Sequence, residues 1–118
     1  MVTAVAVTPD GRQAVSASAD ETLKVWELAS GAELRTLAGH GGGVNAVAVT
    51  PDGRHVVSAS DDRTLKVWDL ASGELIVGLT GDQEMNCIVA ASDQVFVAGD
   101  SGGTVHVLDL LEPQAIAG

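Results

Sequence analysis

The stretch VTAVAVTPDGRQAVSASADETLKVWELASG, residues 2–31, recurs 42 residues later as VNAVAVTPDGRHVVSASDDRTLKVWDLASG, residues 44–73, with identity at 24 of 30 positions. A fixed period of this length means that one supersecondary unit has been copied. Such a unit can bury its apolar face only against a neighbouring copy. The sequence therefore predicts a tandem array, and the array rather than the single copy is expected to be the functional object.

A third, diverged copy follows the second. Its third strand matches that of the second copy at an offset of 40 residues, with Thr104, Val107 and Asp109 in register, and the turn TPDGR has shortened to SDQ at 92–94. Terminal repeats are usually atypical, because one of their faces has no following copy to cover. We expect copies at residues 1–38, 39–80 and 81–110 and a carboxyl-terminal tail at 111–118, with the third copy ending the natural protein.

Within each copy, short runs of apolar residues alternating with small or polar ones predict β-strands. In the first copy a turn at Thr8–Arg12 follows the first strand. Pro9 presets φ there and Gly11 tolerates a positive φ, so the chain reverses into a hairpin. Further strands are expected at 13–18, 22–26 and 33–37. The predicted fold is all-β, with four strands in each of the first two copies. The third copy is expected to supply about three, because Leu111-Glu112-Pro113 and a short apolar tail follow it.

Composition limits the classes of protein to consider. The 118 residues are 46% hydrophobic, carry a net charge of −10, and include one cysteine and three histidines. No apolar run approaches the roughly 18 residues of a membrane span, and Met1–Val7 lacks the features of a secretion signal. An acidic surface repels phosphate backbones, so nucleic acid is not expected as a partner. We expect a cytoplasmic protein without a membrane partner, metal or cofactor.

Two further motifs recur with the strand pattern. The second copy reads GH at 39–40 and KVWDL at 66–70, and the first copy has WE at 26–27 but begins too late to contain a GH. Four antiparallel strands per repeat of about 40 residues, with GH near the start and WD at the end of the third strand, resemble WD-repeat β-propellers. This resemblance implies a partial β-propeller of about three blades, each a four-stranded antiparallel sheet, with an incomplete last blade. The third copy departs from the motif, with Asp82, Ala98 and Leu108 in place of His, Ser and Trp.

The second copy contains His40, Ser58, Asp62 and Trp68, whose residue types could be taken for a hydrolase triad. We reject that interpretation, because no GxSxG elbow precedes Ser58 and the predicted strand around it has no helix to supply an oxyanion hole. The resemblance implies instead a buried, hydrogen-bonded structural tetrad. The chemistry permits it, since an indole N–H only donates, a hydroxyl both donates and accepts, and a neutral imidazole can join hydroxyl to carboxylate. No catalytic residue is expected.

Weaker signals have simpler interpretations. Ser16, Asp20 and Trp26 would form an incomplete tetrad in the first copy. The segment 100–103 lacks the spaced carboxylates of a calcium site and is interpreted as a turn. The glycine-rich segment 39–43 is not followed by the Lys-Ser/Thr of a phosphate-binding loop, so we interpret it as an inter-repeat loop. Cys87 falls on a predicted strand and is expected to be a small buried hydrophobe.

Function is predicted from the architecture, and the principal expectation is a non-enzymatic scaffold that binds a protein or peptide. The resemblance implies that partners bind the face carrying the GH loop and the Asp turn, where the copies differ from one another. The candidate partner-binding face comprises Ala19, Glu21, Gly42, Asp61, Arg63, Gln83, Glu84 and Ser101. Random drift on solvated turns would also produce such differences, so both explanations stay open.

Two alternatives concern the protein to which these repeats belong. The near-identical copies, closed by VAGDSGGTVHVLDL at 97–110, also resemble the carboxyl-terminal propellers of bacterial signalling NTPases of the apoptosome-like class, which would imply a sensor or regulatory segment. Met1 aligns with Gly43, inside a repeat, so we expect a fragment of a longer propeller. The other possibility is a homo-oligomer, in which two chains supply six blades and the near-identical first two copies pair across a symmetric interface.

Overall fold

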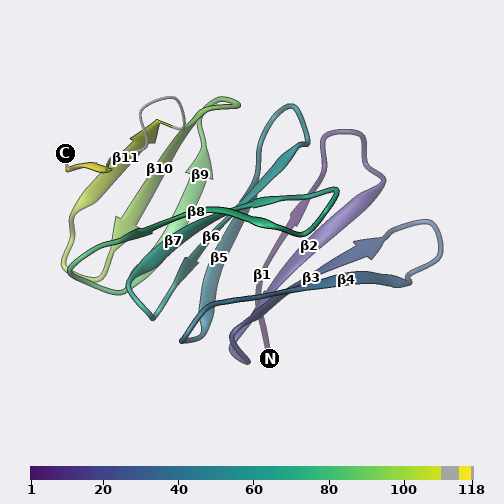
Figure 1. The fold of residues 1–118 in the computed structure, drawn as a ribbon, viewed down its shortest axis with the longest axis horizontal. Coiled ribbons are helices and arrows are strands. Elements are labelled where there is room, and N and C mark those ends of the chain that lie inside the picture. The colour runs from purple at the N-terminus through teal and green to yellow at the C-terminus, as the bar shows by residue number, and fades with distance from the viewer. Residues whose placement is uncertain (110–114, 118) are drawn as a thin grey trace.

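The computed structural model describes residues 1–109 and 115–117, which form three antiparallel sheets side by side (Figure 1). Each sheet follows the chain order, so strands that are consecutive in the chain pair antiparallel within a sheet. Sheet 1 comprises β1 Val2–Val7, β2 Gln13–Ser18, β3 Thr22–Glu27 and β4 Glu33–Ala38. Sheet 2 comprises β5 Val44–Val49, β6 His55–Ser60, β7 Thr64–Asp69 and β8 Leu75–Thr80. Sheet 3 comprises β9 Met85–Ala90, β10 Val95–Asp100, β11 Val105–Asp109 and β12 Ala115–Ala117.

The expected turn between the first two strands is confirmed. The backbone N–H of Gly11 donates to the carbonyl of Thr8 at 2.9 Å, and Gly11 has a φ of 72°. The Thr8 hydroxyl also donates to the carboxylate of Asp10 at 2.6 Å. Thr50, Asp52 and Gly53 repeat the arrangement in sheet 2. Proline and glycine therefore fix both hairpins by the same backbone geometry.

The all-β prediction and the strand positions of the first copy are confirmed, with β3 and β4 each one residue longer than expected. The expected incomplete last blade is confirmed, and its outer strand is short. Leu111, Glu112 and Pro113 lie outside the described residues, but Ala115–Ala117 pair antiparallel with β11 as β12. The outer strand of sheet 3 is therefore present with three residues, where β4 and β8 have six each.

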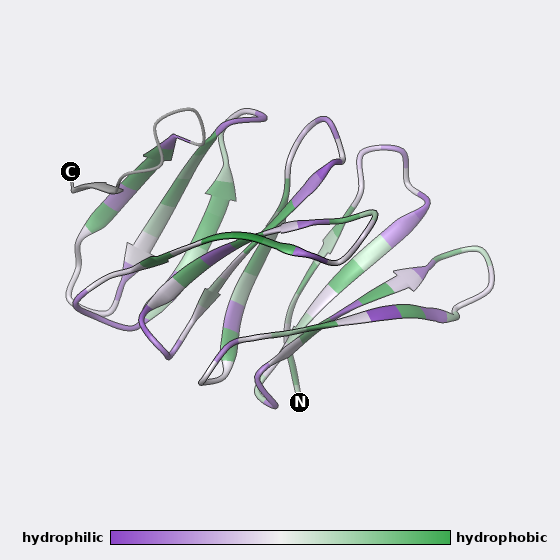
Figure 2. Cartoon of the chain, viewed as in Figure 1, coloured by the Kyte–Doolittle hydropathy of each residue, from purple (hydrophilic) through white to green (hydrophobic). Residues whose placement is uncertain are grey.

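The three sheets spread like a fan. Neighbouring sheets approach most closely at their first strands, β1, β5 and β9, and diverge toward the outer strands (Figure 1). Apolar side chains fill the two spaces between the sheets. Hydrophobic residues lie along the strands, and hydrophilic residues gather at the turns (Figure 2). One core cluster, which includes Val15, Leu23 and Trp68, lies between sheets 1 and 2. A second, which includes Val57, Leu65 and Phe96, lies between sheets 2 and 3.

We call the face of a sheet that points to the preceding sheet its front, and the opposite face its back. Sheet 2 is covered on both faces, whereas the front of sheet 1 and the back of sheet 3 have no sheet against them among the described residues. Val2 and Val5 on the front of sheet 1 are each 59% exposed, although their counterparts Val44 and Val47 are 0% and 8% exposed.

The prediction that Cys87 is buried is wrong: its side chain is exposed. Cys87 lies on β9 at the position that Ala46 holds on β5, and Ala46 packs against the core between sheets 2 and 3. On sheet 3 the same position points to the uncovered back face. The strand was predicted correctly, but no sheet among the described residues covers the face on which the thiol lies.

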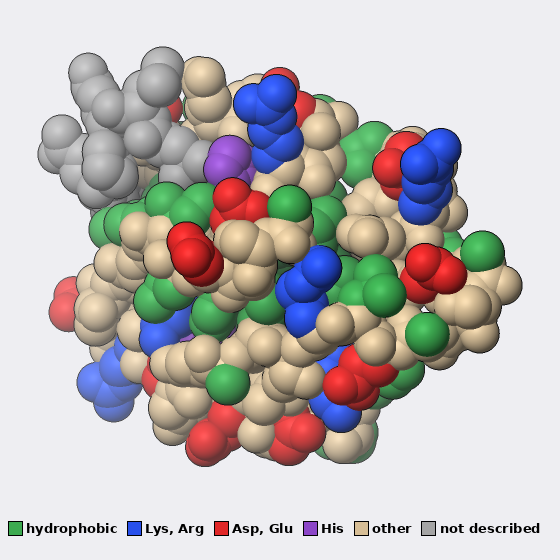
Figure 3. All heavy atoms as spheres, turned by 45° about the vertical axis from the view of Figure 1, so that its right-hand side comes forward, with side chains coloured by type: hydrophobic (Ala, Val, Ile, Leu, Met, Phe, Trp, Pro, Cys, Tyr) green, Lys and Arg blue, Asp and Glu red, His purple; other side chains and the backbone are tan. Residues whose placement is uncertain are grey.

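Charge is spread thinly over the surface. On the face shown in Figure 3, Lys and Arg side chains are scattered singly among acidic, apolar and neutral groups. Lys24 and Glu33 form the one ion pair of a Lys or Arg side chain in the described part of the chain, at 3.2 Å. No helix in that part is long and apolar enough to cross a membrane.

Candidate functional site

The structure brings together the four side chains of the expected tetrad. Trp68 comes from β7 and Ser58 from the neighbouring β6, while His40 and Asp62 come from the loops at one end of sheet 2. The indole Nε1 of Trp68 donates to Ser58 Oγ at 3.0 Å. Ser58 Oγ lies 2.6 Å from Nε2 of His40, and Nδ1 of His40 lies 2.9 Å from Asp62 Oδ2. A continuous chain of hydrogen bonds thus joins the indole to the carboxylate.

The protonation of this chain follows from its donors and acceptors. The Asp62 carboxylate only accepts, so Nδ1 of His40 carries a proton and donates to it, and Nε2 accepts the hydroxyl hydrogen of Ser58. Burial lowers the pKa of His40, although the Asp62 carboxylate acts in the opposite direction. His40 is therefore neutral at pH 7, and every member of the chain has a partner.

Asp62 is held as a carboxylate. Partial burial disfavours its charge, but hydrogen bonds from Thr64, His40 and the backbone N–H of Gly41 outweigh that effect and lower the pKa well below its usual range. The N–H groups of Gly41 and Thr64 each donate to it at 2.9 Å. One carboxylate thereby ties the GH loop to the turn between β6 and β7.

The arrangement is suited to support rather than to catalysis. Ser58 is 0% exposed and its oxygen already accepts the indole N–H, so no substrate can reach it. The members come from β6, β7 and two loops, and their hydrogen bonds fix those segments relative to one another. Among residues 1–109 and 115–117, no three His, Cys, Asp or Glu side chains come together in a way that suits a metal ion.

Sheet 1 holds the expected partial network. The indole of Trp26 donates to Ser16 Oγ at 2.9 Å. Asp20 accepts from the N–H of Thr22 at 3.1 Å and from its hydroxyl at 2.6 Å, but has no imidazole beside it. The position 42 residues before His40 falls ahead of Met1. The carboxylate and the indole are therefore anchored separately.

Sheet 3 replaces the tetrad with apolar packing. Ala98 and Leu108 stand at the positions of Ser58 and Trp68, and both are 1% exposed. Because hydroxyl and indole are replaced together, neither leaves an unpaired polar group, and such a double replacement can be nearly neutral. A different polar pair occurs nearby, with His106 Nε2 at 2.8 Å from Asp100 Oδ2.

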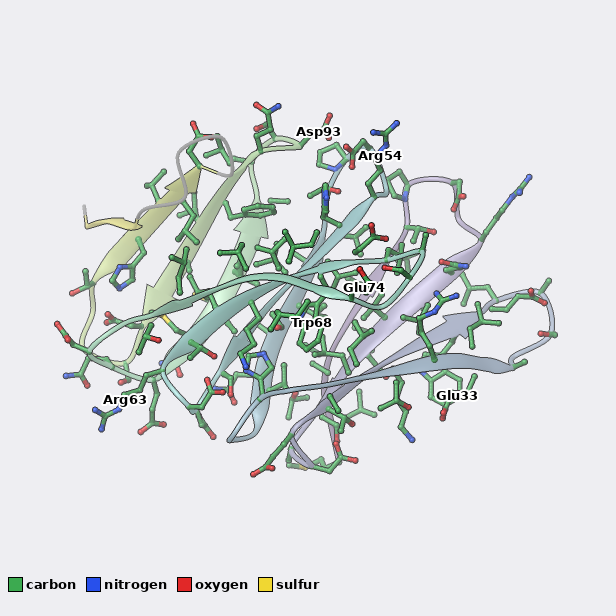
Figure 4. All side chains as sticks on the ribbon, in the orientation of Figure 1. Glu33, Arg54, Arg63, Trp68, Glu74 and Asp93 are labelled. Atoms are coloured by element: carbon green, nitrogen blue, oxygen red, sulfur yellow. The ribbon has the colours of Figure 1, made fainter. Side chains whose placement is uncertain are left out.

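The residues of the candidate partner-binding face lie at one end of the three sheets. All of its residues except Gly42 are exposed, and they lie on the loops at the end of the sheets that also carries the tetrad. The N–H of Ser101 donates to the carbonyl of Glu84 at 2.9 Å. Asn45 donates to the carboxylate of Asp61 at 2.7 Å. In Figure 4, Arg63 points away from the sheets at this end, and Arg54 lies at the opposite end.

The comparisons with known proteins agree with this geometry. The model of the family described as "WD domain, G-beta repeat" matches residues 1–27 and 31–69, which is more than half of the chain. The chain belongs to the WD-repeat family. Domains of this family are typically non-catalytic scaffolds that mediate protein interactions.

Two solved structures show how much of a propeller this WD-repeat chain represents. It superposes on the RRP9 WD40 repeats with a TM-score of 0.93 and 28% identity, covering 98% of this chain and 36% of that one. It superposes on the β-propeller domain of Cps50 (Swd1) from Myceliophteria thermophila with a TM-score of 0.89 and 21% identity, covering 99% of this chain and 38% of that one. The chain thus spans little more than a third of either propeller. No curated protein matches it.

Two features at this end of the molecule were not predicted from the sequence: a hydrogen bond made by Thr64, and a left-handed backbone conformation. Thr64 donates its hydroxyl to Asp62, and a threonine two residues after the tetrad carboxylate also occurs after Asp20, which was a usable signal. Glu21 and Arg63 have φ values of 79° and 71°, in the left-handed region. Gly103 stands at the same position of the third copy with a φ of 88°, and that glycine could have revealed the conformation.

Proposed function

We propose that this WD-repeat segment is a rigid, non-catalytic scaffold whose candidate partner-binding face holds a protein or peptide. The tetrad supports the proposal, because it ties two loops of that face, the GH loop and the turn between β6 and β7, to those strands. A surface fixed in this way is organised before a partner arrives, so less conformational entropy is lost on binding. The face is therefore suited to recognition through loops on a stiff framework.

The observation that carries the proposal is the left-handed backbone of Glu21 and Arg63. Such a conformation costs a residue with a side chain about 1–2 kcal/mol, and Gly103 shows that the same turn accepts glycine. Both side chains are nonetheless long, charged and exposed. Backbone strain that packing does not require is typical of functional positions. Because Glu21 and Arg63 carry opposite charges, the loops of sheets 1 and 2 would then prefer partner groups of opposite charge.

The test is affinity capture with wild-type bait and with a Glu21→Gly/Arg63→Gly bait. The double variant removes two side chains and relieves strain, so its fold is retained while captured proteins should be lost. Arg12→Gly is the control, because it removes an exposed arginine from the turn between β1 and β2, at the opposite end. A double variant that captures the same proteins as wild type would contradict the proposal.

The expectation of a sensor segment in a bacterial signalling NTPase stays a prediction. It rests on the resemblance of the repeats, and its test is the genomic sequence ahead of Met1. An open frame with further repeats and a nucleotide-binding loop would support it.

A further inference from the structure

We propose that a groove between sheets 1 and 2 binds the carboxylate of an acidic side chain in a partner peptide. The polar side chains that line this groove are Gln13, Arg35, Arg54, His55 and Asp69. The groove lies at the end of the sheets that carries the turn between β5 and β6, opposite the candidate partner-binding face, and Arg54 marks that end in Figure 4. Because sheets 1 and 2 supply both walls, the site does not involve the uncovered front of sheet 1 or the uncovered back of sheet 3. The inference goes beyond the proposed scaffold function and does not depend on it.

The groove has the size of a ligand site and contains a large share of the positive charge. Its volume is about 650 Å³, and ligand sites commonly measure about 300–1,000 Å³. Arg35 and Arg54 are two of only six Lys and Arg residues in a chain with a net charge of −10. The imidazole of His55 and the side-chain amide of Gln13 add further N–H donors. The groove is therefore suited to a negatively charged group that accepts hydrogen bonds.

These donors are largely unused within the chain. Nη1 of Arg35 donates to the carbonyl of Leu70 at 2.8 Å, which holds the guanidinium of β4 against sheet 2. A guanidinium has several N–H groups and no acceptor, so most of its donors stay available. Among the described residues, neither Arg35 nor Arg54 forms an ion pair, and Nδ1 of His55 is buried without a hydrogen-bond partner. A ligand that accepts hydrogen bonds would therefore pair with groups that the chain leaves unpaired.

Asp69 determines which anion fits the groove. Its carboxylate accepts the N–H groups of Ala71 and Ser72 at 2.9 and 3.2 Å, so it fixes the turn after β7. A ligand in the groove nevertheless meets its negative charge. A phosphate group carries a charge of about −1.5 to −2 at pH 7 and a carboxylate only about −1, so Asp69 repels the phosphate more strongly. A carboxylate also matches the planar fork of a guanidinium, with which it forms two parallel hydrogen bonds.

The next joint shows that packing does not require these donors. Val77 on β8 pairs with β7 at the position at which Arg35 on β4 pairs with β3. Val95 on β10 likewise holds the position that His55 holds on β6. The joint between sheets 2 and 3 thus has valines where the joint between sheets 1 and 2 has an arginine and a histidine. A ligand that binds only at the first joint accounts for this difference.

The experiment is a titration of the chain with three blocked alanine peptides, which carry glutamate, glutamine or phosphoserine at the centre, followed by proton–nitrogen spectra. The glutamate peptide is expected to shift the backbone amide signals of Gly53, Arg54 and His55. It should bind about tenfold more tightly than the glutamine peptide, because a charged acceptor strengthens each hydrogen bond to a guanidinium. It should also bind more tightly than the phosphoserine peptide. Equal binding of the glutamate and glutamine peptides, or tighter binding of the phosphoserine peptide, would overturn the proposal.

Arg54→Gln tests the groove itself. The Arg54 side chain is exposed and forms no ion pair with any described residue. The variant should therefore keep the fold and bind the glutamate peptide about tenfold more weakly. Lys24→Gln is the matched control, because it removes the same charge from the front of sheet 1. Leu23 and Val25 point into the core between sheets 1 and 2, so Lys24 points away from the groove, and this variant should bind as the wild type does.

Two further results would contradict the site. Equal weakening in Arg54→Gln and Lys24→Gln would show attraction by net charge alone, and a wild type whose groove signals do not shift would show no binding. Either result would leave the scaffold proposal intact, since that proposal concerns the loops at the other end of the sheets.

Discussion

At the scale of single residues, Ser58 and Ser16 offer a matched comparison. Ser58 accepts a hydrogen bond from Trp68 and donates one to His40. Ser16 accepts one from the half-buried Trp26. Ser58→Ala leaves two buried groups unpaired and should lower the free energy of unfolding by about 1–3 kcal/mol, and His40→Ala should have a similar effect. Ser16→Ala should cost less than about 1 kcal/mol. Urea denaturation measures both, and equal losses in the two serine variants would contradict a connected tetrad.

The pH dependence of stability provides a second test of the same residues. Because burial lowers the pKa of folded His40, the unfolded chain, with a pKa of about 6.5, takes up a proton at higher pH than the folded chain does. The contribution of His40 to the free energy of unfolding is thus present above about pH 6.5, and it is lost as the pH falls toward the pKa of the folded state. Asp62 has a lowered pKa, so its own contribution is lost only below about pH 4.

His40→Gln removes the titrating group while keeping a polar side chain. Unfolding free energies measured at about pH 7.5 and about pH 5.5 should differ less in His40→Gln than in the wild type. A variant whose stability falls as steeply as that of the wild type would show that other groups cause the dependence.

Arg63→Gly should stabilise the fold. Glycine adopts the left-handed conformation without the cost that Arg63 bears there, and the expected gain is up to about 1 kcal/mol, reduced by the greater freedom of glycine in the unfolded chain. Asp61→Gly is the control: Asp61 has no positive φ and accepts a hydrogen bond from Asn45, so this change should destabilise. Thermal unfolding measures both, and a destabilised Arg63→Gly would show that the arginine side chain makes contacts that outweigh the strain.

At the scale of elements, the middle sheet should be the most protected from hydrogen exchange. Both faces of β6 and β7 are covered by core clusters, while β2 and β3 border an open front face and β10 and β11 an open back face. Amides that open only with much of the structure exchange slowest. Exchange measured on the chain should therefore rank sheet 2 above sheets 1 and 3. Equal protection in all three sheets would contradict a fan with open ends.

Strands and turns of this chain were predictable because their causes are local. Pro9 and Gly11 favour the φ values that the turn at Thr8–Arg12 needs. The alternation of side chains along a strand determines which residues share a face. Whether a face is buried depends instead on a neighbour, which is why Cys87 was assigned wrongly although its strand was correct. The short strand Ala115–Ala117 was missed because a run of three apolar residues is too short to carry a strand signal of its own, and it pairs where β11 offers an edge.

At the scale of the whole molecule, the tetrad was the part of the candidate site that could be predicted from the sequence. His40, Ser58, Asp62 and Trp68 come together because the repeat fixes their spacing, and a residue with one chemical role can be inferred from that spacing. The binding preference of the loop face cannot be inferred in the same way, because the fold does not dictate the chemical type of exposed side chains such as Glu21 and Arg63. For their left-handed backbone, the glycine at the same position of the third copy, Gly103, was the one signal in the sequence.

The central claim is that repeated sheets stack, and that the middle sheet is locked by a buried indole. The chain has two tryptophans, so a proton–nitrogen spectrum contains two indole signals that report the claim directly. The signal of Trp68, which is 2% exposed and bonded to Ser58, should exchange slowly with solvent, and that of half-buried Trp26 faster. Slow exchange of Trp68 that disappears in His40→Ala is the predicted result. Two indole signals that exchange immediately in the wild type would contradict the account.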